Sequence, residues 1–155
     1  MLSIQNLEVV YQDVILVLRG ISFEIPKGKI VALLGSNGSG KTTVIRSITG
    51  LLDVQNGDIT KGSITLDGED ITNLNPSKIV EKGIAQVMEG RRIFSELTVA
   101  ENLRLGGHTN SANIQNNIDK VLEMFPALKD RQKGEAGYLS CLLYTSDAAD
   151  EITGV

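Results

Sequence analysis

The sequence lacks most features that mark secreted, membrane-spanning or nucleic-acid-binding proteins. Its one cysteine, Cys141, has no partner for a disulfide within the chain. No apolar run approaches the roughly 20 residues that a membrane-spanning helix needs, so we expect no direct membrane span. The formal net charge is -4 and Lys and Arg do not cluster, so we expect no nucleic-acid partner. The start of the chain alternates in polarity and carries Glu8 and Asp13, unlike a signal peptide.

The chain contains a glycine-rich loop between a predicted strand and a predicted helix. The stretch "GSNGSGKTT" follows the apolar run "IVALL" and precedes a predicted helix. It meets the pattern G-x-x-x-x-G-K-[ST], which is typical of loops that bind nucleotide phosphates. Ordinary glycine-rich turns also match this pattern, but a strand before it and a helix after it are the context that supports phosphate binding. The fixed positions of the pattern are Gly35, Gly40, Lys41 and Thr42.

Each residue type in this loop has a chemical reason. Glycines at 35, 38 and 40 are predicted to let the backbone adopt conformations that side chains forbid, so that consecutive N–H groups converge on phosphate oxygens. The positive end of the following helix points at the same anion. Lys41 is predicted to neutralise the β- and γ-phosphates, and Thr42 to offer its hydroxyl to Mg²⁺. The predicted binding residues are Gly35, Ser36, Asn37, Gly38, Ser39, Gly40, Lys41, Thr42 and Thr43.

The remaining pattern predicts an α/β fold with a β-rich start, one strand–helix unit and then helices. Continuous apolar residues predict central strands, covered on both faces, at 30–34 and 84–88. Other strands are predicted at 2–11, 18–26 and 61–71. Helices are predicted from Lys41 to Gly50, over 75–83 behind the cap Asn75, from Thr98 with its capping partner Glu101, and over 114–125.

Several segments together resemble the ATP-binding subunits of ABC transporters. They are "LRGISFEIPKGKIVALLGSNGSGKTTVIRSITGLL", "GSITLDGEDIT" and "GIAQVMEGRRIFSELTVAENLRLGG", in the family's order. The resemblance covers residues 1–140. It implies a P-loop NTPase core of the RecA-like type with an N-terminal antiparallel β layer over 1–88, and the start of an α-helical subdomain over 89–140. It also implies ATP and Mg²⁺ as cofactors, a partner ATPase subunit in a homo- or heterodimer, and membrane permease subunits that hold the protein at the inner face of the cell membrane.

The resemblance also assigns two residues outside the loop. Tyr11 takes the place of an aromatic residue that stacks on adenine, although an aromatic filling a core edge is the alternative. Glu89 takes the place of a glutamine that contacts Mg²⁺, and a carboxylate oxygen can do the same. Gln86 lies three residues too early for that role. Glutamate in "EGRR" followed by Phe94, together with "ENLRLGG", resembles the second ATPase of branched-chain amino-acid importers. A urea or amide importer is the near alternative, and an ABC ATPase of DNA repair or translation is more distant.

The resemblance stops after Ser140. Cys141 and Leu142 stand where the family signature has two glycines, and residues 141–155 form a tail without family resemblance. The acidic pair that follows an apolar strand and the late switch histidine of the family are not matched, because "DAADE" follows no apolar strand. We therefore expect a truncated fragment without the later core strands, unable to hydrolyse ATP by itself. The alternative is a natural short protein that binds nucleotide without hydrolysis.

Overall fold

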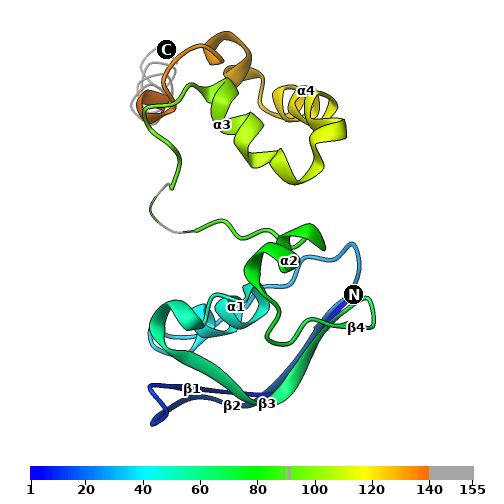
Figure 1. Cartoon of the computed structure of the whole chain (residues 1–155), viewed down its shortest axis with the longest axis vertical. Coiled ribbons are helices and arrows are strands. Elements are labelled where there is room, and N and C mark those ends of the chain that lie inside the picture. Colours follow the sequence, from blue (N-terminus) through cyan, green and yellow to red (C-terminus); the bar gives the residue numbers. More distant parts are fainter. Residues whose placement is uncertain (89, 91, 140–155) are drawn as a thin grey trace, which may run out of the picture. The chain divides into compact units, whose positions relative to one another are not determined.

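The chain divides into two compact units in the computed structural model, which describes residues 1–88, 90 and 92–139. The first unit is Met1–Gln86, and the second begins at Val87 (Figure 1). Each unit contains its own helices and buried side chains, and the first also contains a sheet. The predicted α/β class is confirmed, including the antiparallel layer at the N-terminus. The functional boundary after residue 88 stays a prediction.

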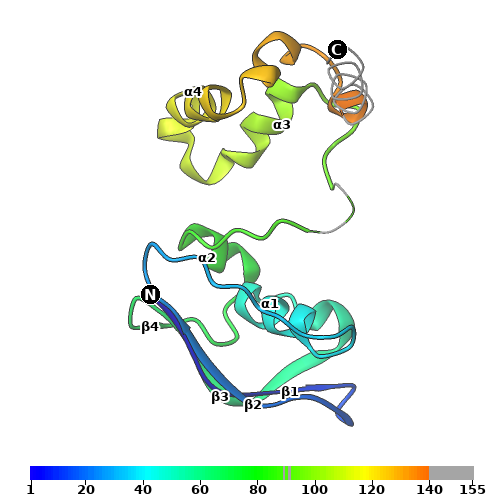
Figure 2. The same ribbon diagram turned by 180° about the vertical axis from the view of Figure 1, so that it is seen from behind.

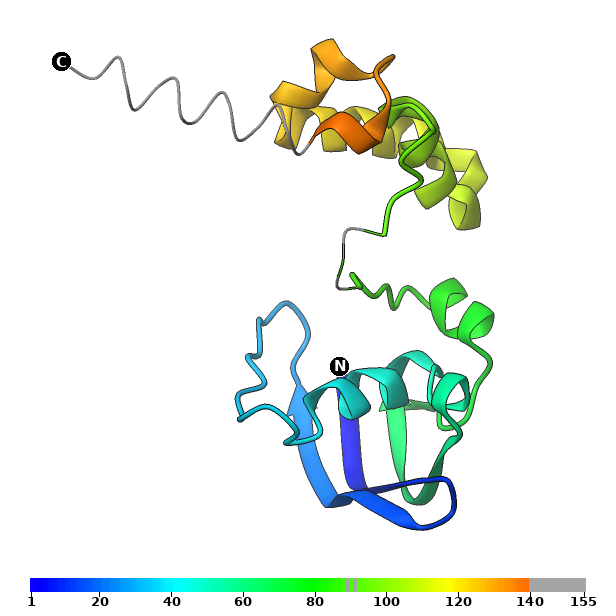
Figure 3. The ribbon, with the colours of Figure 1, turned by 90° about the vertical axis from the view of Figure 1, so that its left-hand side faces the viewer.

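An antiparallel sheet forms the base of the first unit. Strand β1 pairs with β2 on one side and β3 on the other (Figure 3). Figure 2 shows the same sheet edge-on. A tight turn at Asp67 and Gly68, both with positive φ, joins β3 to the short strand β4, as expected of a two-residue hairpin. The strands are β1 (Leu2–Tyr11), β2 (Ile15–Ile25), β3 (Gly57–Leu66) and β4 (Glu69–Asp70), in the order β2-β1-β3-β4.

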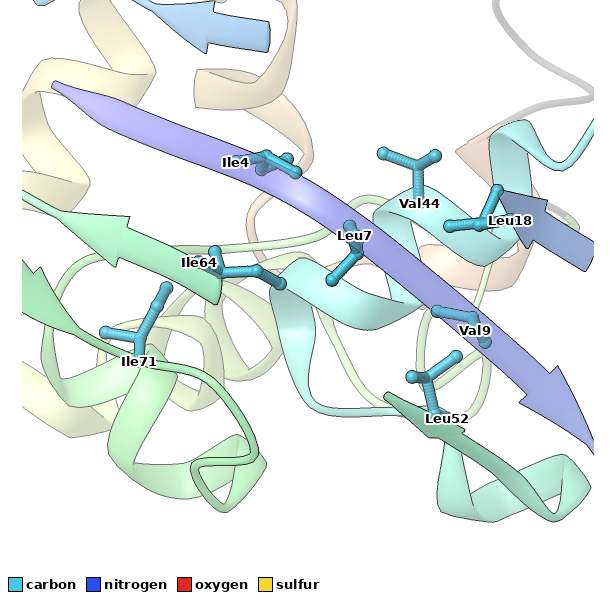
Figure 4. Close-up of a cluster of buried hydrophobic side chains, with 8 residues drawn as sticks. All are labelled: Ile4, Leu7, Val9, Leu18, Val44, Leu52, Ile64 and Ile71. Carbon is cyan, nitrogen blue, oxygen red and sulfur yellow. The ribbon is translucent and has the colours of Figure 1, made fainter. Parts of the chain in front are cut away.

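Helix α1 (Lys41–Thr49) lies against one face of this sheet (Figure 3). It ends where predicted, at Gly50 in the left-handed conformation. Val44 of α1 packs in a cluster with side chains of β1 such as Leu7 (Figure 4). Because each large apolar side chain contributes about 1.5–3 kcal/mol when buried, this cluster fixes the start of α1 firmly against the sheet. The whole cluster is Ile4, Leu7, Val9, Leu18, Val44, Leu52, Ile64 and Ile71.

The two predicted central strands are not formed, so that prediction is wrong for this chain. Residues 30–34 and 84–88 have no regular secondary structure. Ile30 is fully exposed and Leu34 is 88% exposed. A strand needs hydrogen-bonding neighbours along its edges, and in the part of the chain that the structure describes no strand pairs with either segment. An apolar run records how well a segment suits burial, but it does not supply the neighbours.

The short helices of the first unit follow their local signals. Helix α2 (Pro76–Glu81) begins at Asn75, whose side-chain oxygen accepts a hydrogen bond from the Ser77 amide at 2.9 Å. A single 3-10 turn, η1 (Asp53–Gln55), connects α1 to β3. The predicted helix over 75–83 is therefore confirmed, with its cap.

The second unit is helical within the described residues. Helix α3 (Val99–Gly106) carries the predicted capping box between Thr98 and Glu101, and α4 (Ile114–Met124) buries Ile118 and Leu122 of its predicted apolar stripe. Among the helices described, none is both long and apolar enough to cross a bilayer. Three 3-10 segments complete the unit: η2 (His108–Asn113), η3 (Pro126–Arg131) and η4 (Ala136–Tyr138).

Candidate functional site

The glycine-rich loop joins the end of β2 to the start of α1 and projects into solvent (Figure 3). Gly38 and Gly40 have φ values of +82° and +91°, a backbone conformation that strains any other residue. Gly40 also approaches β2 so closely that a Cβ there would lie 2.7 Å from Leu18 Cδ2. The first bond of the helix runs from the Val44 amide to the Gly40 carbonyl, at 2.9 Å. The two glycines therefore set the angle at which the loop enters α1.

The ammonium group of Lys41 closes this loop from inside. Its Nζ donates to the carbonyl oxygens of Gly35 and Ser36, and both distances are 2.7 Å. Hydrogen bonds from a charged donor are stronger than neutral ones, so they hold the first turn of the loop against the first turn of α1. The predicted contact of Lys41 with phosphate stays a prediction, and it requires the ammonium to leave or share these carbonyls.

Gly35 is a glycine for a different reason from the one predicted. Its φ lies outside the left-handed region, so its backbone conformation suits other residues. A Cβ at Gly35 would instead overlap Ser39 Oγ and lie 3.1 Å from Ser39 Cβ, closer than atoms in packed interiors approach. The prediction of a special backbone conformation is thus wrong at Gly35. The Ser39 side chain leaves no room for a side chain at position 35.

The loop and the start of α1 have the properties that an anion site needs. No acidic residue lies in the first turn of α1, so nothing there opposes the positive end of the helix dipole. The hydroxyl-bearing Thr42 is exposed in that turn, whereas Thr43 beside it is buried. Exposed amides, one cation and a helix N-terminus are together the donors that phosphate groups accept. These residues therefore fit a nucleotide triphosphate.

The same residues fit Mg²⁺ only in company with phosphate. Within residues 1–88, 90 and 92–139, no group of three His, Cys, Asp or Glu side chains is placed to hold a metal ion. Mg²⁺ is commonly bound through substrate phosphates and few protein ligands, and the exposed hydroxyl of Thr42 suits such a role. Glu89, the second predicted metal ligand, lies outside the described residues.

Tyr11 ends β1 close to this site and is half-buried. Its Oη donates to Thr43 Oγ1 at 3.4 Å, which links the sheet to the first turn of α1. Its ring packs on Gly57, where a Cβ would lie 2.5 Å from Tyr11 Cε1. This is the packed position that an aromatic at a core edge takes. Stacking of the ring on adenine stays a prediction.

One contact of the site was beyond sequence reasoning. Thr49 Oγ1 donates to Gln86 Oε1 at 3.0 Å, so the end of α1 holds the segment that leads toward position 89. Gln86 was predicted to lie in a strand and has a structural contact instead. The pair is 37 residues apart in the chain, and no local pattern marks it.

A cavity of about 700 Å³ opens beside the β1–β2 turn but does not suit phosphate. Three carboxylates lie along it, and like charges repel a phosphate group. Two turns that are distant in the sequence form its walls. Its lining residues are Gln12, Asp13, Asp53, Asn56, Gly57 and Asp58.

The second unit contains an apolar cavity of about 470 Å³ beside α3. Asn102 shapes its rim, because its side chain accepts from the Phe94 amide at 3.0 Å and donates to the Phe94 carbonyl at 2.9 Å. Phe94 lines this cavity and is 63% exposed. The cavity is therefore an accessible apolar surface.

Comparison with known proteins decides the family. A family model described as "ABC transporter" matches residues 18–141, which include the whole glycine-rich loop. This chain belongs to the ABC transporter family. ATPases of the family hydrolyse ATP. The predicted resemblance is thereby confirmed.

Two relatives of this chain carry branched-chain amino-acid transport in their names. The high-affinity branched-chain amino acid transport ATP-binding protein BraG of Pseudomonas aeruginosa is 44% identical over 84% of this chain and 54% of its own length. The probable branched-chain amino acid transport ATP-binding protein LivF of Archaeoglobus fulgidus is 37% identical over 80% of this chain and 51% of its own length. The chain thus spans about half the length of these relatives.

Solved structures of ABC transporter cassettes share the fold. A nucleotide-free ATP-binding cassette is 29% identical, with a TM-score of 0.72 over 90% of this chain and 58% of its own length. A cassette in its ADP conformation has the same identity, coverage and TM-score.

Proposed function

We propose that this chain is the nucleotide-binding part of an ATP-binding subunit of an ABC importer, and that its glycine-rich loop binds ATP. The loop at the exposed start of α1 carries the proposal, because it combines Lys41, backbone amides and a helix N-terminus without an acidic neighbour. The cassette of similar fold in its ADP conformation supports it. The names of BraG and LivF support branched-chain amino acids as the transported solutes.

ATP would be held by groups of the loop, of α1 and of the end of β1. The amides of residues 36–41 and the Lys41 ammonium bind the phosphates, Tyr11 stacks on adenine, and Thr42 with Glu89 holds Mg²⁺. When bound, Mg²⁺ neutralises phosphate charge. Lys41 moves from two neutral carbonyl acceptors to charged phosphate oxygens, and hydrogen bonds between charged partners are the stronger ones.

Hydrolysis would require the residues of the family signature, and this sequence differs from that signature. In the family signature, backbone donors of a partner subunit reach the γ-phosphate from a helix N-terminus. Cys141 and Leu142 replace the two glycines of that signature here, and a bulky leucine obstructs such an approach. The chain by itself is therefore proposed to bind ATP without turning it over, which favours the second candidate function, a nucleotide-binding module without hydrolysis.

The proposed partners are a second ATPase subunit and membrane permease subunits. Permease subunits would place the protein at the inner face of the cell membrane. The apolar cavity lined by Phe94 supports such a contact, because an exposed apolar surface of this kind is typical of interaction sites. A urea or amide importer remains the alternative assembly.

A transport experiment tests the importer assignment. Residues 1–139 replace the matching part of BraG, and the hybrid is expressed in P. aeruginosa that lacks its own BraG. We expect uptake of labelled branched-chain amino acid to be restored, and to be abolished by Lys41→Ala in the hybrid. A stably produced hybrid without uptake would contradict the assignment.

A turnover experiment tests the second half of the proposal. Phosphate release from MgATP is measured for the 155-residue chain and for Lys41→Ala. We expect neither protein to release phosphate above background. Release by the unchanged chain that disappears in Lys41→Ala would show that this chain supplies the missing groups.

A further inference from the structure

The side chains of Ser39 and Lys41 both lie beside Gly35. Ser39 Oγ and Cβ occupy the space in which a side chain at position 35 would lie. The carbonyl of Gly35 accepts a hydrogen bond from Lys41 Nζ at 2.7 Å, and Lys41 Cδ is 3.9 Å from the position of a Cβ at Gly35. The backbone turns back between them, with the Ser39 amide donating to the Ser36 carbonyl at 3.2 Å. The loop therefore packs closely around Gly35, where there is no room for a Cβ.

A methyl group at position 35 cannot be accommodated by rotating the Ser39 hydroxyl alone. Ser39 Cβ itself would lie 3.1 Å from the new carbon, well inside the usual separation of about 3.5–4.0 Å between carbon atoms. Ser39 Cβ, and with it the backbone of the Ser36–Ser39 turn, has to move by a few tenths of an ångström. The same turn carries amides that are proposed to bind phosphate.

We propose that Gly35 and Ser39 act as a pair that sets how the loop closes, so that Ser39 is a positioning residue for the phosphate site. This inference rests on the proposed binding of ATP. Ser39 acts through the backbone, because its side chain fills the space beside Gly35 and so fixes the Ser36–Ser39 turn. The amides and the carbonyls that hold Lys41 then take their positions from this packing.

Gly38 in the same loop offers a matched contrast. It has a φ of +82°, and a Cβ there would have no atom within 4 Å. Gly38 is therefore a glycine because of its backbone conformation, while Gly35 is a glycine because of its neighbour. A substitution at Gly35 is predicted to be relieved by removing the Ser39 side chain, and the same substitution at Gly38 is not.

Calorimetric titration of the full 155-residue chain with MgATP tests the pair. The proteins compared are the unchanged chain, Gly35→Ala, Gly38→Ala, Ser39→Gly, and each alanine variant combined with Ser39→Gly. Because neighbouring residues couple strongly, we expect Gly35→Ala to weaken affinity by about 30-fold or more and Ser39→Gly by only about threefold. The combination should bind within about twofold of Ser39→Gly alone. The affinity of Gly38→Ala for MgATP is expected to stay low when this change is combined with Ser39→Gly. Gly38→Ala is also expected to lower the melting midpoint, because alanine is strained at a φ of +82°.

Two results would contradict the proposed role of Gly35 and Ser39 as a pair. One is a Gly35→Ala/Ser39→Gly protein that binds as weakly as Gly35→Ala, which would show that Gly35 serves close approach of phosphate instead. The other is equal recovery of Gly38→Ala by Ser39→Gly, which would show only greater flexibility of the loop. If the unchanged chain does not bind MgATP, the proposed function and the pair both fall. Binding by the unchanged chain without recovery overturns the pair alone.

Discussion

The Nζ of Lys41 lies 2.7 Å from the carbonyl oxygen of Gly35, six residues earlier in the chain. A second carbonyl, that of Ser36, accepts from the same nitrogen at the same distance. The loop thus satisfies its own cation when no phosphate is present. A phosphate group at the proposed site would compete with these two carbonyls, and its negative charge would favour it because opposite charges attract. In the proposed function, nucleotide binding would exchange these carbonyl partners of Lys41 for phosphate oxygens.

Tyr11 provides a test of adenine recognition. If its ring stacks on adenine, Tyr11→Ala should lose the roughly 0.5–1.5 kcal/mol that such stacking adds, about a twofold to tenfold weaker affinity for MgATP. Tyr11→Phe keeps the ring but removes the hydrogen bond to Thr43, and should bind MgATP nearly as well as the unchanged chain. Titration of each variant with MgATP measures both.

Inorganic tripolyphosphate serves as the control ligand for Tyr11, because it has the phosphates without the base. Its affinity should be the same for Tyr11→Ala and the unchanged chain. An equal loss for tripolyphosphate and ATP would mean that Tyr11 only supports α1 through Thr43 and Gly57, and that it does not stack on adenine.

The exposed apolar segment at 30–34 should make the protein prone to associate. Ile30 is fully exposed and Leu34 is 88% exposed, and contiguous apolar surface of this kind promotes aggregation. The double substitution Ile30→Ser with Leu34→Ser should reduce light scattering and binding of an apolar dye. Val54, which is 76% exposed in η1, gives the control substitution Val54→Ser, with little effect expected. Equal effects of the two changes would argue against a role for the segment.

The capping box of α3 should make that helix sensitive to acid. The pKa of Glu101 is held below its usual value by hydrogen bonds from the Thr98 hydroxyl, at 2.6 Å, and from the Thr98 amide, at 2.8 Å. A lowered pKa in the folded state stabilises the fold above the unfolded pKa of about 4.3. That contribution is lost as the pH falls through the folded pKa. The protection of the α3 amides against hydrogen exchange, relative to an unstructured chain at the same pH, should therefore fall below about pH 4.

Glu101→Gln is the matched control for this pH effect, because glutamine also forms a capping box but does not ionise. The α3 amides of this variant should lose less protection over the same pH range than those of the unchanged chain. The same loss in both proteins would place the acid sensitivity elsewhere.

Helix ends were predictable because their signals are local. Asn75 caps α2, Thr98 and Glu101 cap α3, and Gly50 ends α1 in the left-handed conformation. Each signal acts over three or four residues, so the sequence alone contains it. The strands predicted at 2–11 and 18–26 were also found as β1 and β2, although β2 begins earlier, at Ile15.

Features that depend on distant neighbours were not predictable. The run 30–34 has the composition of a central strand, yet it forms none, because strand formation depends on partners elsewhere in a chain. Gly35 was attributed to backbone conformation, whereas the structure assigns it to the space taken by Ser39. The contact of Tyr11 with Thr43 and Gly57 also joins separate elements. Tertiary contacts decide the fate of the 30–34 run and the position of Tyr11, whereas the conformation of the loop itself decides Gly35.

The affinity of the 155-residue chain for MgATP tests the central claim most directly, measured by calorimetric titration with Lys41→Ala and Lys29→Ala beside the unchanged chain. Lys29 is exposed and lies in the connection that leads from β2 to α1, so its substitution removes the same charge away from the proposed site. We expect Lys41→Ala to weaken affinity by about 10- to 100-fold, since hydrogen bonds to charged groups contribute about 1.5–3 kcal/mol, while Lys29→Ala binds like the unchanged chain. Equal affinities for Lys41→Ala and the unchanged chain, or no binding by any of the three, would contradict a phosphate site at residues 35–43.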